Sequence, residues 1–324
     1  MNRLYYAYAR HALVTALRVT RVRPGDVVLL PNFICRDVLA SLAAVQASAV
    51  YYDIGDDLQI SPTGSLPSAK VLLAVNYFGF PANLERIRDR LSDSSTVLIE
   101  DNAHGWLSSD DAGVALGSRT ALGITSFRKT IRSLDGAFLE WQDGAIHDAS
   151  TLHEPLPFRD EPLALSYRLR RNISLLDHTS GFNLLPTARK YVRFVRRLSG
   201  RPPIDPHVED EFKLPQHRAL HQSSFTMMNA INIEEERHRR RSSFQACQLL
   251  ADEYGVRTPH LAMTDGVCPM GFPYFPNSSR DEAFRRAIRR QRLGEIITWP
   301  SLPATSTLSS TSILRELHLV NFLQ

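Results

Sequence analysis

The sequence has little of several features that mark particular classes of protein. It has only three cysteines, Cys35, Cys247 and Cys268, in no CxxC pair and at no metal-ligand spacing, so we expect reduced thiols and no metal site. No apolar run approaches the roughly 18 residues that a membrane span needs. The N-terminus has no apolar segment of the secretory type. These absences predict a cytoplasmic protein with no membrane partner.

Lysine is also scarce. Only four of the 38 basic residues are lysines: Lys70, Lys129, Lys190 and Lys213. Where arginine fills nearly every cationic position, a lysine at the end of an apolar run can serve a chemistry that arginine cannot. Lysine can lose its proton and form a Schiff base, whereas arginine stays protonated. The alternative for Lys129 is an ordinary surface lysine beside Arg128 and Arg132.

The basic charge balance does not by itself predict a nucleic-acid partner. The formal net charge is +4 and the pI is near 9.0, but the arginines are spread along the whole chain. The densest run, 237–241, follows three glutamates at 234–236. Opposite charges three to four residues apart are typical of a solvated helix face. We therefore expect no nucleic acid among the partners.

Apolar and charged residues make up 43% and 22% of the 324 residues, which is typical of a globular protein with one or two domains. In the first half, apolar runs predict short buried strands and helical spacings predict helices between them. The predicted strands are 27–30, 49–52, 71–75, 97–99 and 137–141, and the predicted helices are 5–19, 37–45 and the face formed by Leu84, Ile87 and Leu91. This alternation predicts a parallel sheet with helices on both faces.

Two apolar runs end in groups that carry chemistry. The run from Val97 ends in Glu100 and Asp101, and a second run ends in Lys129, shortly before the turn at Asp135-Gly136. Ligands of α/β proteins bind outside the carboxyl ends of the strands. We therefore expect these side chains to lie together at one edge of the sheet.

These motifs resemble those of the DegT/DnrJ/StrS-type sugar aminotransferases, a family of fold-type I pyridoxal-phosphate enzymes. The segment 100–104, Glu-Asp-Asn-Ala-His, is similar to the family's Glu-Asp-x-Ala-(Gln/His) strand end. Ser126-Phe127, Lys129 and 135–137 are similar to its Ser-Phe strand, its lysine and its Asp/Glu-Gly-Gly turn. The resemblance implies a three-layer α/β fold, with a mostly parallel central sheet between helices and a small α+β C-terminal domain.

The resemblance also implies roles around pyridoxal 5'-phosphate. Asp101 would keep the pyridine nitrogen protonated, as the cofactor's electron-sink chemistry requires, and His104 would lie near the phenolic oxygen. Lys129 would attach to the cofactor and then move the proton. Ser126, Arg10 and His11 would hold the phosphate, the last two at a helix start. From the residues alone, Asp101 can instead cap a helix, and His104 can be a structural histidine with satisfied hydrogen bonds. Ser126 can bond to backbone, and Arg10 and His11 can be exposed helix residues.

An aromatic ring often stacks on the cofactor in this family. The corresponding place falls at Cys35, with Phe33 two residues earlier as a substitute, although a role for Phe33 in the core is equally simple.

The chain departs from the family pattern at several places. The family's lysine usually comes five residues after the serine, whereas Ile131 stands there and Lys129 comes only three after. The glycine of the phosphate turn is absent, and we expect no N-terminal arm because little precedes the first predicted helix. Gly181-Phe182-Asn183 is only a fragment of the segment that reaches the partner subunit. A non-catalytic scaffold, or a dehydratase or lyase that uses His104 as a base, therefore stands as an alternative.

The second half suggests a separate small domain. The proline-rich segment 201–206 predicts a linker, so we place a cofactor domain at 1–205 and a small domain at 206–324. Predicted helices cover 163–176, 187–198, 224–254 and 283–294, with a strand at 272–276. The resemblance implies a homodimer that transfers an amino group from glutamate to a nucleotide-linked keto-sugar.

Overall fold

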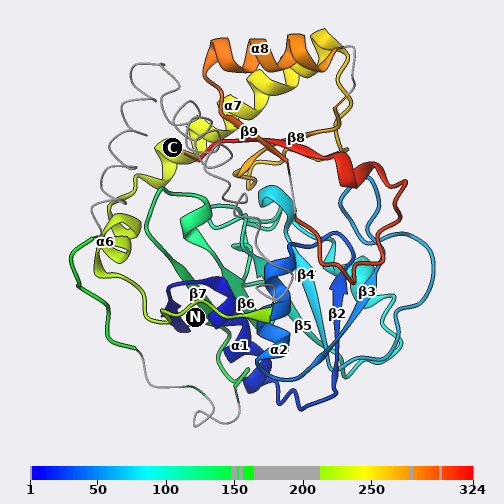
Figure 1. Ribbon diagram of the computed structural model, residues 1–324, viewed down its shortest axis with the longest axis vertical. Coiled ribbons are helices and arrows are strands. Elements are labelled where there is room, and N and C mark those ends of the chain that lie inside the picture. The colour runs from blue at the N-terminus through cyan, green and yellow to red at the C-terminus, as the bar shows by residue number, and fades with distance from the viewer. Residues whose placement is uncertain are drawn as a thin grey trace, which may run out of the picture.

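The computed structural model describes residues 2–146, 152, 156–163, 212–276, 280–298 and 301–323. They form a seven-stranded sheet with its helices and a smaller three-stranded sheet with its own helices (Figure 1). The helices predicted within 164–176 and 187–198, the fragment 181–183, and the linker and domain boundary near residue 205 lie outside the described residues.

The large sheet has the order β1-β7-β6-β5-β4-β2-β3. Strands β2 to β6 are parallel, β7 is antiparallel to β6, and β1 is antiparallel to β7. The predicted mostly parallel sheet is therefore confirmed. The strands are β1 (Asn2–Tyr6), β2 (Val27–Pro31), β3 (Ser48–Tyr52), β4 (Val71–Val75), β5 (Val97–Asn102), β6 (Leu122–Thr125) and β7 (Ala137–Trp141).

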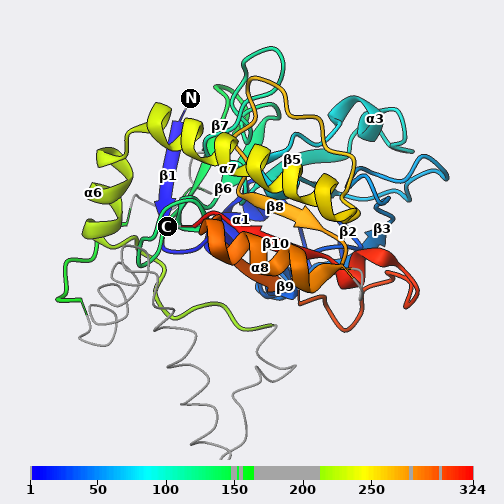
Figure 2. The same ribbon diagram turned by 90° about the horizontal axis from the view of Figure 1, so that it is seen from above.

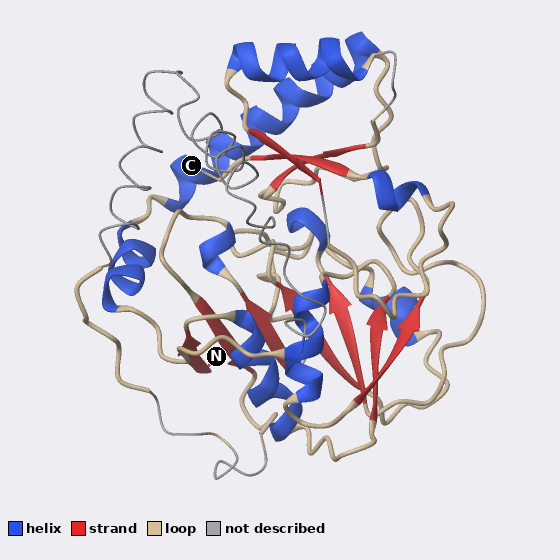
Figure 3. Ribbon diagram, viewed as in Figure 1, coloured by secondary structure: helices blue, strands red, loops and turns tan. Residues whose placement is uncertain are grey.

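Alternate residues of the central strand β4 pack on opposite faces of the sheet, because successive side chains of a strand point to opposite sides. Val71, Leu73 and Val75 share a core with apolar residues of α1 (Ala9–Val19) and α2 (Leu39–Ala43). Leu72 and Ala74 pack instead with α3 (Leu84–Arg88). Each fully buried Leu or Val side chain contributes about 1.5–3 kcal/mol. Helices therefore cover both faces, as Figure 3 shows in blue and red.

Two details of the N-terminal region differ from the prediction. The helix predicted from Tyr5 begins only at Ala9, because Tyr5 lies in β1 and pairs with Phe138 of β7. An ion pair of 3.0 Å between Arg3 and Glu140 joins the same two strands. The helix predicted from Asp37 begins as a 3-10 turn, η1 (Arg36–Val38), and no side chain caps it.

The small sheet has the order β8-β10-β9 and is antiparallel throughout. Its strands are β8 (Gly271–Tyr274), β9 (Glu295–Thr298) and β10 (His318–Asn321), and its helices are α7 (Ile233–Tyr254) and α8 (Asp281–Gln291). Helix α6 (Gln222–Ala230) precedes α7, so the single helical region predicted over 224–254 is in fact two helices. They separate before Asn232, whose side chain caps α7 by accepting from the amide of Glu235 at 3.3 Å.

The small sheet and its helices lie at one end of the large sheet, at the top of Figure 1 and nearest the viewer in Figure 2. The rings of Phe80 and Phe244 meet at 5.6 Å between centroids, and both residues belong to the core that also includes β4. This contact fixes the small domain over the carboxyl ends of the parallel strands. None of the helices described here is long and apolar enough to cross a bilayer.

Candidate active site

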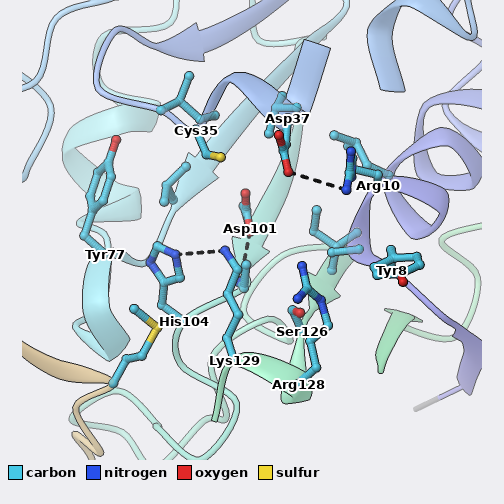
Figure 4. Close-up of a pocket in the computed structure, with 18 of the residues that line it drawn as sticks. Tyr8, Arg10, Cys35, Asp37, Tyr77, Asp101, His104, Ser126, Arg128 and Lys129 are labelled. Atoms are coloured by element: carbon cyan, nitrogen blue, oxygen red, sulfur yellow. Dashed lines mark hydrogen bonds and ion pairs between the residues drawn. The ribbon is translucent and has the colours of Figure 1, made fainter. Parts of the chain in front are cut away.

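A cavity of about 350 Å³ opens at the carboxyl ends of the parallel strands (Figure 4). This size suits a small organic ligand. The loops after β2, β4, β5 and β6 and the start of α1 contribute side chains to it, and the small domain contributes Met270, Asn321 and Leu323. The residue pattern predicted this edge of the sheet as the location of the site, and Asp101, His104, Ser126, Lys129 and Arg10 all line this one cavity.

Asp101 lies at the end of β5 and is almost completely buried. Burial raises the pKa of its carboxyl group, and the nearby Lys129 opposes that rise. Its Oδ1 accepts from the amide of Ala103 at 2.9 Å, which fixes the orientation of the carboxylate. Residues 103–121 form turns and contain no helix, so the alternative of Asp101 as a helix cap is wrong.

A single 3-10 turn, η3 (Phe127–Lys129), brings Lys129 into the cavity. The side chain of Ile131 instead packs in an apolar cluster with Phe127 and Phe138. The turn therefore accounts for the lysine spacing: the residue three after Ser126 faces the cavity, and the residue five after it faces the core. Lys129 is only partly exposed and lines the cavity, so the alternative of an ordinary surface lysine does not hold. Burial lowers the pKa of its amine.

Gly136 makes this turn possible. Its φ is +143°, and a Cβ at this position would lie 2.1 Å from the ring of Phe127. The amide of Arg128 donates to the Gly136 carbonyl at 3.2 Å, and the Ser126 hydroxyl donates to the same oxygen at 3.4 Å. Ser126 thus bonds to backbone, as one alternative held, while it also lines the cavity.

His104 contacts Lys129 directly. Its Nε2 lies 3.2 Å from Lys129 Nζ, and its Nδ1 accepts from the amide of Phe78 at 3.2 Å. The Phe78 ring stacks on the imidazole with 5.7 Å between centroids and 6° between planes. Burial lowers the pKa of His104 well below its ordinary value. His104 is therefore neutral.

The structure separates the two residues predicted at the start of α1. Arg10 lines the cavity, and its Nη2 lies 3.4 Å from Asp37 Oδ2. His11 is buried and is not among the lining residues. Burial lowers the pKa of His11 to about 4, and the charge of Arg218 adds to this effect. Neighbouring side chains of an α-helix point roughly 100° apart, and of these two only the Arg10 side chain lines the cavity.

Sequence reasoning left Arg128 without a role and did not single out Tyr8. Both line the cavity, and the Arg128 guanidinium lies over the Tyr8 ring at 5.2 Å. Burial lowers the pKa of Arg128, and its Nε is buried without a hydrogen-bond partner. A buried N–H donor without a partner costs about 1–3 kcal/mol. Together with Arg10 and the start of α1, Arg128 makes this end of the cavity suited to an anion.

Both residues considered for a ring-stacking role, Phe33 and Cys35, line the cavity. Phe33 is completely buried, and its ring lies 5.6 Å from that of Tyr77. The Tyr77 hydroxyl donates to the Phe33 carbonyl oxygen. The loop after β2 is thus held against the turn after β4.

Comparison with known proteins is consistent with this arrangement. Residues 6–154 match the model of the DegT/DnrJ/EryC1/StrS aminotransferase family. Protein MosB of Rhizobium meliloti is 28% identical over 141 residues, which are 41% of this chain and 27% of MosB. A UDP-N-acetyl-3-dehydro-alpha-D-glucosamine 3-aminotransferase of Acidithiobacillus ferrooxidans is 27% identical over 121 residues, which are 36% of this chain and 32% of that protein. The matched region thus spans only about a third or less of these curated relatives.

Solved structures resemble nearly the whole chain. A DegT DnrJ EryC1 StrS aminotransferase from Brucella abortus aligns with a TM-score of 0.61 at 16% identity, over 99% of this chain and 80% of that one. The E. coli GDP-4-keto-6-deoxy-D-mannose-3-dehydratase, solved with bound hydrated PLP, aligns with a TM-score of 0.61 at 13% identity, over 99% and 83%. At these identities the likeness shows the fold. Over residues 6–154 this chain therefore matches the DegT/DnrJ/EryC1/StrS aminotransferase family, and its fold is the one that these solved structures share.

Proposed function

We propose that this chain binds pyridoxal 5'-phosphate and transfers an amino group from glutamate to a keto group of a nucleotide-linked sugar. The observation that carries this proposal is the convergence of Asp101 and Lys129 in one buried cavity. They come from the ends of neighbouring parallel strands, and His104 contacts the lysine amine at 3.2 Å. The family match over residues 6–154 supports the same chemistry.

The residues of the cavity fit the three ends of this cofactor. Asp101 offers a carboxylate to a pyridine nitrogen, and Lys129 offers a primary amine to an aldehyde. Arg128, with its buried Nε that has no partner, offers a donor to a phosphate, and Arg10 and Ser126 line the same cavity. When bound, the cofactor supplies an electron sink for the bonds of the substrate carbon.

The chain's own groups have distinct tasks in this proposal. Asp101, oriented by the Ala103 amide, holds a positive charge on the ring nitrogen through its carboxylate. Lys129 Nζ takes a proton from the substrate carbon and returns it, for which an amine with a lowered pKa is suited. His104 orients that amine.

A half-reaction tests the proposal without knowledge of the acceptor. Protein loaded with pyridoxal 5'-phosphate and mixed with glutamate alone should release about one equivalent of 2-oxoglutarate per site. Lys129→Ala should release none, whereas Lys70→Ala, which removes an exposed lysine, should behave as the wild type. A wild type that binds the cofactor yet releases no 2-oxoglutarate would rule out transamination from glutamate.

The name of the Acidithiobacillus relative supports a sugar nucleotide as the acceptor. A panel of UDP-, GDP- and dTDP-linked keto-sugars, offered to protein already treated with glutamate, would identify the class by mass spectrometry of the aminated product. An amino acceptor outside the sugar nucleotides would refute this part of the proposal.

A dehydratase is the second candidate, because His104 places an imidazole beside the lysine amine and one structural neighbour is named as a dehydratase. A dehydratase would remove a hydroxyl group from the keto-sugar without leaving an amino group on it. Product mass separates the two reactions. A chain that neither binds the cofactor nor changes a substrate would instead be a non-catalytic scaffold.

We also propose a homodimer, in keeping with a family whose sites lie at subunit interfaces. Light scattering coupled to size exclusion should then give twice the mass of the 36.5 kDa chain. A mass of one chain at micromolar concentration would contradict it.

A further inference from the structure

Phe78 has a backbone conformation that aromatic residues rarely adopt. It lies in the 3-10 turn η2 (Tyr77–Gly79) after β4, with φ 56° and ψ 18°, in the left-handed region. Its amide donates to His104 Nδ1 at 3.2 Å, and its carbonyl accepts from the amide of Met270 at 2.7 Å. These two bonds, with the stacked ring, hold the peptide in this conformation. Such strain is found where the surrounding structure imposes it, often at functional sites.

The Phe78 amide determines which nitrogen of His104 carries the proton. A backbone N–H can only donate, so Nδ1 must offer its lone pair. An imidazolium would place an N–H of Nδ1 against the N–H of Phe78, and the Nδ1–H tautomer would do the same. Both forms conflict with the contact. The neutral ring therefore carries its proton on Nε2.

The proton on Nε2 in turn determines the form of Lys129. An ammonium group has three donors and no acceptor, whereas an unprotonated amine has a lone pair. The distance of 3.2 Å between His104 Nε2 and Lys129 Nζ is a hydrogen bond from an Nε2–H only if the amine is unprotonated. Burial acts in the same direction, because it lowers the pKa values of Lys129 and His104.

The charged groups around the amine shift the pKa of Lys129 in opposite directions. Asp101, Asp37 and a deprotonated Cys35 would favour an ammonium, whereas Arg128 disfavours it. Burial raises the pKa of the Cys35 thiol, which keeps it neutral. Asp101, which is a carboxylate in the proposed function, opposes the unprotonated lysine, whereas burial, the largest effect on the lysine pKa, favours it. Burial and the contact with His104 therefore act together against this nearby negative charge.

We propose that the Phe78 amide locks His104 in its Nε2–H tautomer, and that His104 holds Lys129 as an unprotonated amine at neutral pH. Phe78 and His104 are positioning residues in this account, since each acts through its neighbour on the lysine. The inference deepens the proposed function and takes its purpose from it, because an unprotonated amine is the form that attacks an aldehyde.

The protonation states can be read directly by ¹⁵N NMR of protein without cofactor. In [¹⁵N]histidine-labelled protein, His104 should show an unprotonated Nδ1 and a protonated Nε2, and His104→Gln should remove these two signals. In [¹⁵N]lysine-labelled protein, with only four lysines, the Nζ signal that Lys129→Arg removes should have the shift of an amine at pH 7. A proton on His104 Nδ1, or an ammonium shift for Lys129 at pH 7, would overturn the proposal.

Replacing the Phe78 amide by an ester tests the lock itself. Phenyllactate incorporated at position 78 removes the N–H and keeps the ring. The His104 signals should then show a mixture of tautomers, and the Lys129 titration should move to higher pH. An ester at Phe80, whose amide donates to Tyr77 O at 3.0 Å, is the matched control for losing one bond of the same turn. Unchanged His104 signals in the Phe78 ester would overturn the role of the amide.

The contribution of the ring is separated by Phe78→Gly, which keeps the N–H and tolerates a positive φ. The Nε2–H tautomer should persist in this variant, and its loss would assign the tautomer to ring packing instead. All of these measurements are made without cofactor, so their outcomes do not depend on whether the protein binds the cofactor. A chain that shows these protonation states but binds no pyridoxal phosphate would refute the proposed function alone.

Discussion

The guanidinium of Arg240 donates to the carbonyl oxygen of Thr130 at 2.5 Å and so ties helix α7 to the residue that follows Lys129. Arg240 is completely buried. It also pairs with Glu236 at 2.5 Å and donates to the carbonyls of Pro269 and Met270. One side chain of the small domain therefore contacts both the turn that presents the lysine and the backbone of Met270, which lines the cavity.

Arg240→Met should destabilise the protein by about 3–5 kcal/mol, because the buried carbonyls of Thr130, Pro269 and Met270 lose this charged donor. Glu236 keeps its ion pair with Arg239. The substitution should also weaken cofactor binding, because the turn that presents Lys129 loses the hydrogen bond from Arg240 to the Thr130 carbonyl. Urea unfolding and a cofactor titration measure the two effects. Arg257→Met removes an exposed pair with Asp56 and should cost about 1 kcal/mol or less. Equal losses of unfolding free energy and of cofactor affinity in the two variants would contradict the role of Arg240 in holding the Lys129 turn.

Moving the lysine to the family's usual place should not restore function. In Lys129→Ala/Ile131→Lys the new lysine stands five residues after Ser126, but position 131 faces the apolar cluster of Phe127 and Phe138. We expect no covalent cofactor and a loss of roughly 2–5 kcal/mol of stability, as for other large disruptions of a core. Absorbance with cofactor and urea unfolding test this. A cofactor bound covalently in the double variant would show that a lysine at position 131 can reach the cavity.

Arg128 should contribute to affinity through the phosphate. Losing a hydrogen bond to a charged group costs about 1.5–3 kcal/mol, so Arg128→Met should bind pyridoxal 5'-phosphate roughly ten- to a hundredfold more weakly. Pyridoxal, which lacks the phosphate, should bind the variant and the wild type alike. Arg132→Met is the control, because Arg132 donates to the carbonyl of Leu323 and is not among the lining residues. If Arg128→Met weakened the binding of both ligands by the same factor, Arg128 would not contact the phosphate.

The rate of cofactor attachment should level off at unusually low pH. Only the unprotonated amine reacts, so the rate rises with pH up to the pKa of Lys129 and is flat above it. Burial lowers that pKa below 10.5. Relative to acetyl-lysine amide under the same conditions, the plateau should therefore begin at lower pH. An identical profile for protein and model compound would show an ordinary lysine.

The same pKa shift has a consequence for stability. Between the lowered pKa of the folded protein and the ordinary value of the unfolded chain, the unfolded state binds more protons. The free energy of unfolding should therefore gain a favourable contribution from Lys129 as the pH rises through that window. In Lys129→Met this contribution should be absent from the alkaline side of the pH profile.

The sequence predicted the location of the site because parallel strands bring their carboxyl ends to one edge. Asp101 and Lys129 follow apolar runs, and two such runs in a parallel sheet place their end residues together. The local spacing anomaly at Lys129 could not be resolved from the sequence. The position of Lys129 depends on a single turn that Gly136 permits. It also depends on the packing of Ile131 against residues that are distant in the sequence, such as Leu220 and Met228.

Other features had no local signal. Tyr5 continues a helical spacing, and its place in β1 depends on pairing with Phe138, more than 130 residues away. The contact between Phe78 and His104 depends on a left-handed conformation that no residue preference indicates for phenylalanine. Arg10 and His11 are neighbours in sequence, so only the rotation of α1 shows which of them faces the cavity.

The most direct test of this account is to find which residue carries the cofactor. Protein incubated with pyridoxal 5'-phosphate, reduced with borohydride and digested should yield a modified peptide in which Lys129 bears the label. The near-visible band should disappear on reduction, and it should be absent from Lys129→Ala but present in Lys70→Ala. A label on Lys70, Lys190 or Lys213 instead, or no label at all, would contradict the assignment of Lys129.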